Sequence, residues 1–195
     1  MIRAAVCLDA RLRTHQGQHA AAEVLLQHAL GNGFGLPAAG TDLVHDSCGR
    51  PAVAAHPEVH VSVSHCEGAV LVAASSARIG VDVEWLRPLD RFALARMLNP
   101  AEIDRVLRSP DPDREFFRYW TLKESYLKAV GTGLGYAVKD LDVDVAPDGT
   151  ASVRSRQAWV GLDERFEGYV LAFCSLDSGP GDTDVALERR ELTRL

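Results

Sequence analysis

The chain has 195 residues, of which 47% are hydrophobic and 25% are charged, and this is the composition of a globular protein with a sizeable core. The formal net charge of −6 excludes a general nucleic-acid binder, and four scattered cysteines without a Cys-x-x-Cys pair exclude a zinc motif and a disulfide framework. The apolar run at the N-terminus is too short for a signal peptide or a membrane span, so we expect a cytoplasmic protein that binds neither membrane nor nucleic acid.

The first part of the chain predicts a strand, a helix and then a group of short strands. Alternating or apolar runs bounded by turn residues predict strands over 2–8, 42–45, 59–65, 70–74 and 81–84, and an Ala- and Leu-rich run predicts a helix over 18–30. The last three strands follow one another through tight turns, as in an antiparallel meander. We therefore expect a first α+β half over residues 1–90.

The second part predicts helices followed by strands. The spacing of apolar residues and the caps predict helices over 92–98, from 99 onward and over 113–130, and strands over 141–145, 151–154 and 168–175. Residues 177–195 begin with Ser-Gly-Pro-Gly and predict a tail on the surface. We therefore expect a second α+β half over 91–195, without a visible sequence repeat between the halves.

Asp82 and Glu84 are two residues apart on a predicted strand, so both side chains project from one face, with Cα atoms roughly 6.5–7 Å apart. Two carboxylates on one face can share a hard cation such as Mg²⁺, which takes oxygen ligands and keeps water molecules for a phosphate. A solvated strand face explains the same pair when it is considered alone.

Glu124 and Lys128 are one turn apart on the long predicted helix, at the edge of an apolar stripe that contains Phe117 and Trp120. An ordinary salt bridge of about 0.2–0.5 kcal/mol is one explanation of this pair. The shared stripe predicts partial desolvation, however, and a carboxylate there can act as a third metal ligand or as a general base.

Ser64 and His65 end a predicted strand beside a glycine-containing turn, where both side chains can donate to a phosphate. Arg50, in the segment Gly49-Arg50-Pro51, can add positive charge to the same anion. A histidine considered alone is more often structural. No Walker loop and no Gly-x-Gly-x-x-Gly motif is present in the sequence.

Three of these segments occur together with a characteristic order and spacing. Ser-x-Ser-His at 62–65 precedes Gly-Val-Asp-Val-Glu at 80–84, and Trp-x-x-Lys-Glu-Ser-x-x-Lys follows at 120–128. The combination resembles the 4'-phosphopantetheinyl transferases over roughly residues 45–175, and is most similar to their larger, surfactin-synthetase-activating type. The resemblance implies an α+β pseudo-dimer of two similar halves, each with a long helix against a small antiparallel sheet, and a monomeric chain.

The family moves the phosphopantetheine arm of coenzyme A, its co-substrate, onto a serine of an acyl or peptidyl carrier protein and releases 3',5'-ADP. The resemblance implies that Asp82, Glu84 and Glu124 hold Mg²⁺ on the coenzyme A pyrophosphate. It also implies that Glu124 is the base for the carrier serine. Lys128, together with Lys123, is then expected to face the phosphate under attack.

The resemblance assigns Ser64 and His65 to the 3'-phosphate of coenzyme A and Arg50 to its adenosine end. The sequence departs from the family pattern before the first long helix, where only about ten residues replace a helix and a basic loop. Arg11 and Arg13 are the only basic residues there apart from histidines. We therefore expect fewer contacts to the adenosine and the 3'-phosphate.

Two other classes of function remain open at this point. The Asp-x-Glu strand with a later glutamate and lysine also suggests a metal-dependent nuclease, although the acidic balance counts against it. The second alternative is a non-catalytic module that binds coenzyme A or a carrier protein. Carrier proteins are acidic, so the docking surface should carry local positive charge, for which Arg91, Arg96, Arg105, Arg108 and Arg118 are the candidates.

Overall fold

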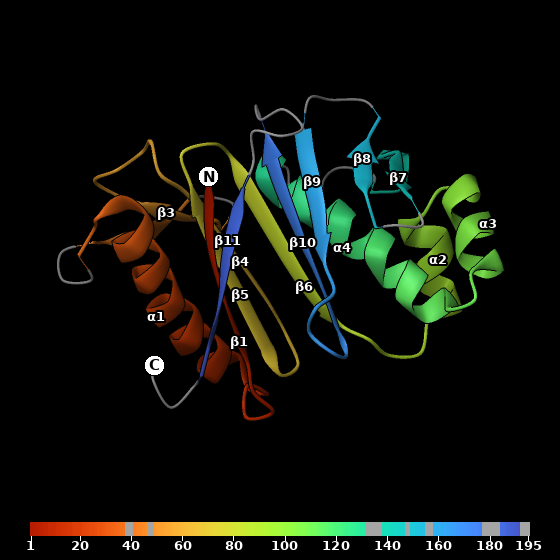
Figure 1. The fold of residues 1–195 in the computed structure, drawn as a ribbon, viewed down its shortest axis with the longest axis horizontal. Helices are drawn as coiled ribbons and strands as arrows, with labels where there is room; N and C mark the ends of the chain where they lie inside the picture. The colour runs from red at the N-terminus through yellow and green to blue at the C-terminus, as the bar shows by residue number, and fades with distance from the viewer. Residues whose placement is uncertain are drawn as a thin grey trace.

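The computed structural model describes residues 1–37, 41–46, 49–131, 138–146, 149–154, 158–176 and 184–191. The two larger sheets lie side by side, each with one long helix packed on it (Figure 1), and two further pairs of short strands form small sheets. Within the described residues no helix is both long enough and apolar enough to cross a membrane.

The first sheet has the strand order β11-β1-β5-β4. Its strands are β1 (Ile2–Leu8), β4 (His60–Cys66), β5 (Ala69–Ser75) and β11 (Val185–Arg190). The helix α1 (His15–Phe34) buries several of its alanine and leucine side chains against this sheet. Thr14 caps the start of α1, and Gly35 ends it with a left-handed φ of 66°.

The second sheet has the order β6-β10-β9. Its strands are β6 (Ile79–Trp85), β9 (Ala158–Asp163) and β10 (Tyr169–Leu176), and α4 (Pro112–Val130) packs on it. Two shorter helices, α2 (Arg91–Met97) and α3 (Pro100–Arg108), connect β6 to α4 and lie beyond it (Figure 1). Asn99 and Glu102 form a reciprocal capping box at the start of α3, as the Asn-Pro pair predicts.

The same succession of elements occurs twice along the chain. Each copy consists of a strand, a long helix, a small hairpin and two paired strands. In the first half the strand is β1, the helix is α1, the hairpin is β2 (Leu43–His45) with β3 (Pro51–Val53), and the paired strands are β4 and β5. In the second half they are β6, α4, β7 (Val143–Val145), β8 (Ala151–Val153), β9 and β10, with the 3-10 helix η2 (Val138–Asp140) before β7.

The register repeats as well. Ile2 of β1 lies opposite Ser75 of β5, and Ile79 of β6 lies opposite Ser175 of β10. No sequence repeat is visible between the halves, so the repetition is one of structure.

The helices and most strands agree with the sequence predictions, but three features differ. The strand at 79–85 pairs with β10 and not with β5, so the predicted meander stops at β5 and the second sheet begins before the expected boundary at residue 90. The surface tail is a wrong prediction for residues 185–190, which form β11 and pair in parallel with β1. The strands β3 and β9 were not predicted, because β3 is only three residues long and begins at a proline, and β9 contains a glycine.

Candidate active site

The site lies at the boundary between the two sheets, where β4 and β6 run beside each other. Serine side chains of β4 accept hydrogen bonds from the backbone of β6. The Val81 N–H donates to Ser62 Oγ over 3.0 Å, and the Val83 N–H donates to Ser64 Oγ over 3.3 Å. These hydroxyls satisfy buried donors at the edge of the second sheet, which explains why polar residues alternate with valines in this part of β4.

Asp82 is the central acid of the site and is only 5% exposed. Its Oδ1 accepts a hydrogen bond from the Ser64 hydroxyl over 2.7 Å and another from the Lys128 ammonium over 2.7 Å. Its Oδ2 is buried without a hydrogen-bond partner. The structure therefore joins three of the predicted residues directly and leaves one carboxylate oxygen available.

Gly80 explains how α4 comes close enough to β6 for these contacts. A Cβ atom at this position would lie 1.9 Å from the Ser125 carbonyl oxygen and 2.4 Å from the Ala129 backbone nitrogen, both on α4. Any larger residue would push the helix away from the strand. The glycine two residues before Asp82 is thus a structural requirement of the site.

Glu84 is held by two donors that come from different elements. Trp120 Nε1 donates to Glu84 Oε1 over 2.9 Å, and Arg87 Nη1 donates to Oε2 over 2.8 Å. The Arg87 guanidinium also lies 4.6 Å from the ring centroid of Phe117. From the sequence, Trp120 and Phe117 were assigned to an apolar stripe and Arg87 was not predicted, although its position three residues after Glu84 is a usable signal.

Glu124 faces the same acids from α4. Burial raises the pKa of the Glu124 carboxyl, the negative charge of Asp82 raises it further, and Lys128 opposes both effects. Its Oε1 is buried without a hydrogen-bond partner. The carboxylates of Asp82, Glu84 and Glu124 are therefore close enough to repel one another, and two of them carry unsatisfied oxygens.

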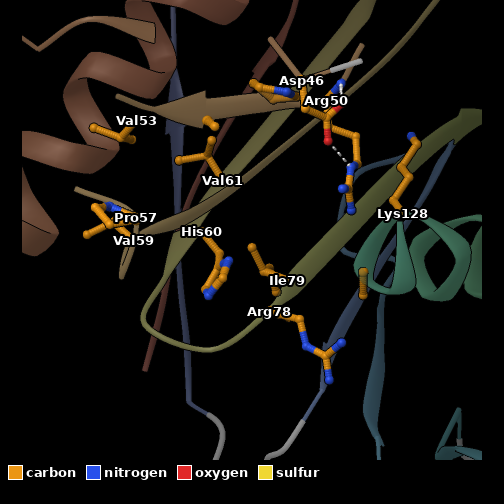
Figure 2. Close-up of a pocket in the computed structure, with 13 residues that line it drawn as sticks. Asp46, Arg50, Val53, Pro57, Val59, His60, Val61, Arg78, Ile79 and Lys128 are labelled. Atoms are coloured by element: carbon orange, nitrogen blue, oxygen red, sulfur yellow. Dashed lines mark hydrogen bonds and ion pairs between the residues drawn. The ribbon is translucent and has the colours of Figure 1, made fainter. Parts of the chain in front are cut away.

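Arg50 and Lys128 line one cavity of about 270 Å³ beside these acids (Figure 2). Figure 2 shows both side chains at one side of the cavity, with His60 and Arg78 on its other walls. Arg50 Nε donates to Asp46 Oδ2 over 2.7 Å, and its guanidinium lies against Gly131 at the end of α4. The predicted Arg50 is thus brought to the end of the helix that carries Lys128.

The structure does not bring Lys123 together with the other predicted site residues. The side chain is fully buried, and its ammonium donates to Glu102 Oε2 over 2.6 Å and to two backbone carbonyl groups. Burial lowers the pKa of Lys123, and Glu102 opposes this effect. Lys123 therefore ties α4 to α3, because position 123 faces a different side of the helix from positions 124 and 128.

Ser64 and His65 point in different directions, as successive residues of a strand must. The Ser64 hydroxyl is buried and engaged with Asp82 and the backbone of β6. His65 is exposed, and its ring lies against that of His15. Of the two, only His65 faces a place where a ligand could lie.

Residues 78–174 match the family model described as the 4'-phosphopantetheinyl transferase superfamily, a segment that begins at β6 and ends within β10. Curated relatives agree. The 4'-phosphopantetheinyl transferase psf-1 of Bacillus pumilus is 29% identical over 68% of this chain and 58% of its own length. A 4'-phosphopantetheinyl transferase of Bacillus subtilis is 28% identical over 78% and 71%, and HetI of Nostoc sp. is 31% identical over 76% and 66%.

The chain belongs to the 4'-phosphopantetheinyl transferase superfamily, and its relatives among the Bacillus transferases make it similar to the surfactin-synthetase-activating type. The matched segment contains Asp82, Glu84, Glu124 and Lys128. The chain spans between 58% and 71% of the length of the three relatives named above.

Proposed function

We propose that this protein transfers the 4'-phosphopantetheine arm of coenzyme A to a serine hydroxyl of an acyl or peptidyl carrier protein and releases 3',5'-ADP. The observation that carries the proposal is the set of contacts around Asp82. Ser64 and Lys128 both donate to its Oδ1, and its charge acts on the Glu124 carboxyl of α4, which packs on the same sheet. The family match to residues 78–174 supports this assignment.

The donor set fits a hard divalent cation such as Mg²⁺. Asp82 Oδ2 and Glu124 Oε1 are buried carboxylate oxygens without partners, and a cation would compensate the cost of leaving them so. Within the described residues, no group of three His, Cys, Asp or Glu side chains is already arranged to hold a metal ion. Both oxygens of Glu84 accept a hydrogen bond, one from Trp120 and one from Arg87.

Asp82, Glu84 and Glu124 would hold the ion, with Glu84 turning from its present partners or using a remaining lone pair. When bound, Mg²⁺ would neutralise charge on the pyrophosphate of coenzyme A. The unpartnered Glu124 oxygen, whose carboxyl has a raised pKa, suits the removal of a proton from the carrier serine.

Lys128 supplies the remaining positive charge. Its ammonium is fixed by Asp82 while its side chain reaches the cavity that Arg50 also lines. A phosphate that enters this cavity meets both cations, and the ammonium is suited to charge that develops on the leaving phosphate. Arg50 is suited to orient the nucleotide, because Asp46 holds its guanidinium in place.

The repeated succession of elements supports a pseudo-dimer of two similar halves in a monomeric chain. In register, Ala5 and Cys7 of β1 stand where β6 has Asp82 and Glu84, since they lie opposite equivalent positions of β5 and β10. The first half therefore lacks the acids, and one chain would have one site.

The carrier protein is expected to dock near α2. Arg105 is bound to Asp144, Arg108 to Asp104, and Arg118 to Glu164 and Glu115. In contrast, no ion pair is found within the described chain for Arg91 or Arg96 of α2, and Phe92 between them is 84% exposed. Two unpaired cations around an exposed aromatic side chain suit an acidic partner.

The proposal is tested by incubating the purified protein with Mg²⁺, coenzyme A and several apo carrier proteins, followed by intact mass spectrometry. We expect a carrier to gain the mass of one phosphopantetheine arm, with release of an equal amount of 3',5'-ADP. A carrier whose acceptor serine is replaced by alanine should remain unmodified. If the protein bound coenzyme A but modified no carrier, the non-catalytic binding module would be the correct interpretation.

A further inference from the structure

Glu84 differs from the other two acids of the candidate site because both of its oxygens already have donors. Asp82 and Glu124 each carry a buried oxygen without a hydrogen-bond partner. Glu84 Oε1 accepts the Trp120 Nε1–H over 2.9 Å, and its Oε2 accepts a hydrogen bond from Arg87 Nη1 over 2.8 Å. Two acids of the site therefore offer an oxygen to a ligand, whereas the third is held by side chains of the same chain.

The two donors to Glu84 are held in different ways. Trp120 lies within α4, and its ring packs against the hydrophobic core of the second half. Arg87 lies between β6 and α2, in a segment without regular secondary structure, and its side chain is 38% exposed. The Arg87 side chain can therefore move without disturbing a helix or a strand, which the Trp120 side chain cannot do.

Arg87 also has contacts that do not involve Glu84. Its Nη1 donates to the Trp85 carbonyl oxygen over 3.0 Å. Its guanidinium lies 4.6 Å from the ring centroid of Phe117 and 5.6 Å from that of Trp85, within the range of cation–π contact. One carbonyl group and two aromatic rings are suited to keep a guanidinium in place. Arg87 therefore has partners that remain when Glu84 turns to another one.

The charges in the site explain why Glu84 has a cation beside it. Asp82 and Glu84 both act electrostatically on Glu124, and Lys128 offsets the charge of Asp82 through an ion pair of 2.7 Å. Within the described residues, Arg87 is the ion-pair partner found for Glu84. Close carboxylates repel one another unless positive charge is supplied. Arg87 thus supplies charge that a divalent cation could supply instead.

We propose that Arg87 is a positioning residue that holds Glu84 in the metal-free protein and is displaced from it by the divalent cation, while Trp120 keeps its hydrogen bond. This inference rests on the proposed function and concerns how its metal site is filled. Arg87 competes with the metal for a carboxylate oxygen, so it raises the metal concentration that the site requires. Trp120 has the opposite effect, because it keeps the Glu84 carboxylate beside the other two acids.

Substitutions of the two donors should therefore change metal binding in opposite directions. Arg87→Met keeps an apolar stem but removes the competing cation, so a divalent cation should bind about three- to tenfold more tightly. Trp120→Phe keeps an aromatic ring but removes the N–H, so the cation should bind about tenfold more weakly. If both donors only maintained the shape of the site, both substitutions would weaken metal binding.

The test is binding of Mn²⁺ to the full chain, measured by electron paramagnetic resonance of the free ion, with Mg²⁺ as a competitor. Mn²⁺ takes the same oxygen ligands as Mg²⁺ and is detected directly. The titrations are made with and without coenzyme A, because a phosphate group can supply metal ligands of its own. The Mg²⁺ concentration for half-maximal transfer should fall in Arg87→Met and rise in Trp120→Phe by the same factors as the dissociation constants.

Displacement of Arg87 is measured separately by its reaction with phenylglyoxal, followed by mass spectrometry of the peptides. A guanidinium that has left a carboxylate is more reactive, so Arg87 should be modified several-fold faster when Mg²⁺ is present. Arg165 is the matched control, because it is bound to Asp163 over 2.6 Å and lies 6.0 Å from the ring centroid of Phe166. Its reaction should not depend on Mg²⁺, and Arg165→Met should bind Mn²⁺ as the unchanged protein does.

Arg87→Lys separates the charge of this side chain from its shape. An ammonium group lacks the planar fork that stacks on an aromatic ring, so it should hold Glu84 less firmly. The affinity for Mn²⁺ should then lie between those of the unchanged protein and Arg87→Met. Circular dichroism shows whether each variant folds, and Arg87→Lys provides the answer if Arg87→Met does not.

Weaker or unchanged Mn²⁺ binding in Arg87→Met, or an Arg87 reaction rate that Mg²⁺ does not change, would overturn the inference and leave the transferase function intact. Tighter binding in Trp120→Phe would also overturn it, because Trp120 would then be a competitor as well. Normal transfer without any binding of Mn²⁺ would have the same meaning. Absence of both metal binding and transfer to any carrier would instead contradict the proposed function.

Discussion

Ser64 and Asp82 are joined by a 2.7 Å hydrogen bond that crosses from one sheet to the other. The same serine oxygen accepts the Val83 N–H, so the hydroxyl proton can only point toward the aspartate. Strand β4 of the first sheet thus fixes the orientation of an acid on β6 of the second sheet. The packing of the two sheets therefore determines the geometry of the site. Substitutions of single residues at this boundary can test that link.

Ser64→Ala should reduce both stability and transfer. The change leaves the Val83 N–H without a partner and leaves Lys128 as the remaining donor to Asp82 Oδ1, and an unsatisfied buried N–H costs about 1–3 kcal/mol. Urea denaturation measures the free energy of unfolding, and initial rates measure transfer. Ser62→Ala is the control, since it removes an acceptor for the Val81 N–H but no contact to Asp82. An equal loss of transfer in both variants would show that orientation of Asp82 is unimportant.

Gly80→Ala should separate β6 from α4. The new methyl group would overlap backbone atoms of Ser125 and Ala129, and overpacking of this kind costs about 1–3 kcal/mol or more. Transfer should also fall, because Asp82 and Lys128 move apart. Gly31→Ala, on the exposed side of α1 with 3.6 Å to its first neighbour, should instead be neutral or stabilising by up to about 1 kcal/mol. Thermal unfolding compares the two.

Lys123→Met and Lys128→Met should have opposite consequences. Lys123→Met leaves Glu102 buried without its cation, so we expect a loss of about 3–5 kcal/mol of stability. The folded fraction should still transfer, because Lys123 does not reach the site. Lys128 is partly exposed, so Lys128→Met should cost less stability but abolish most transfer. Activity must be compared per folded molecule, and full activity of Lys128→Met would contradict the assigned role.

The sequence predicts what depends on local patterning. The alternation of valine with serine in β4, the Asn-Pro start of α3 and the apolar stripe of α4 predict their elements, because propensity and burial favour the same structure there. Contacts between residues far apart in the chain could not be predicted in this way. The pairing of β11 with β1 depends on the closing of a sheet edge, which no local pattern encodes.

The candidate site shows the same division. Asp82, Glu124 and Lys128 could be assigned together because their spacing on a strand and a helix recurs in the family. The direction of the Lys123 side chain could not be predicted. Adjacent helix positions point about 100° apart, and only the fold shows which side of α4 faces the candidate site. The partners of Glu84 were also missed, because Trp120 has an apolar ring that the stripe explains without its N–H.

Glu124 allows a prediction in which stability and activity change in opposite directions. Its folded pKa is raised above the unfolded value of about 4.3, so the folded protein holds a proton more readily than the unfolded chain. Stability must then decrease as the pH rises through this window, and the full cost is present above the folded pKa. Glu124→Gln removes that cost, so the variant should be more stable than the unchanged protein at pH 7, with no gain near pH 4.

Transfer by Glu124→Gln should fall by about 10²–10⁴-fold, because the amide cannot accept the serine proton. Mg²⁺ should raise the melting temperature of the unchanged protein, since a cation relieves the repulsion among the three acids, and should raise that of Glu124→Gln less. Glu58→Gln, whose side chain is 68% exposed, is the control and should show neither effect. Higher stability with full activity would show that the base lies elsewhere. If Glu124→Gln were less stable than the unchanged protein at pH 7, the buried Glu124 oxygen would have a partner in solution and would not destabilise the fold. The assignment of Glu124 as a metal ligand would then have to be abandoned.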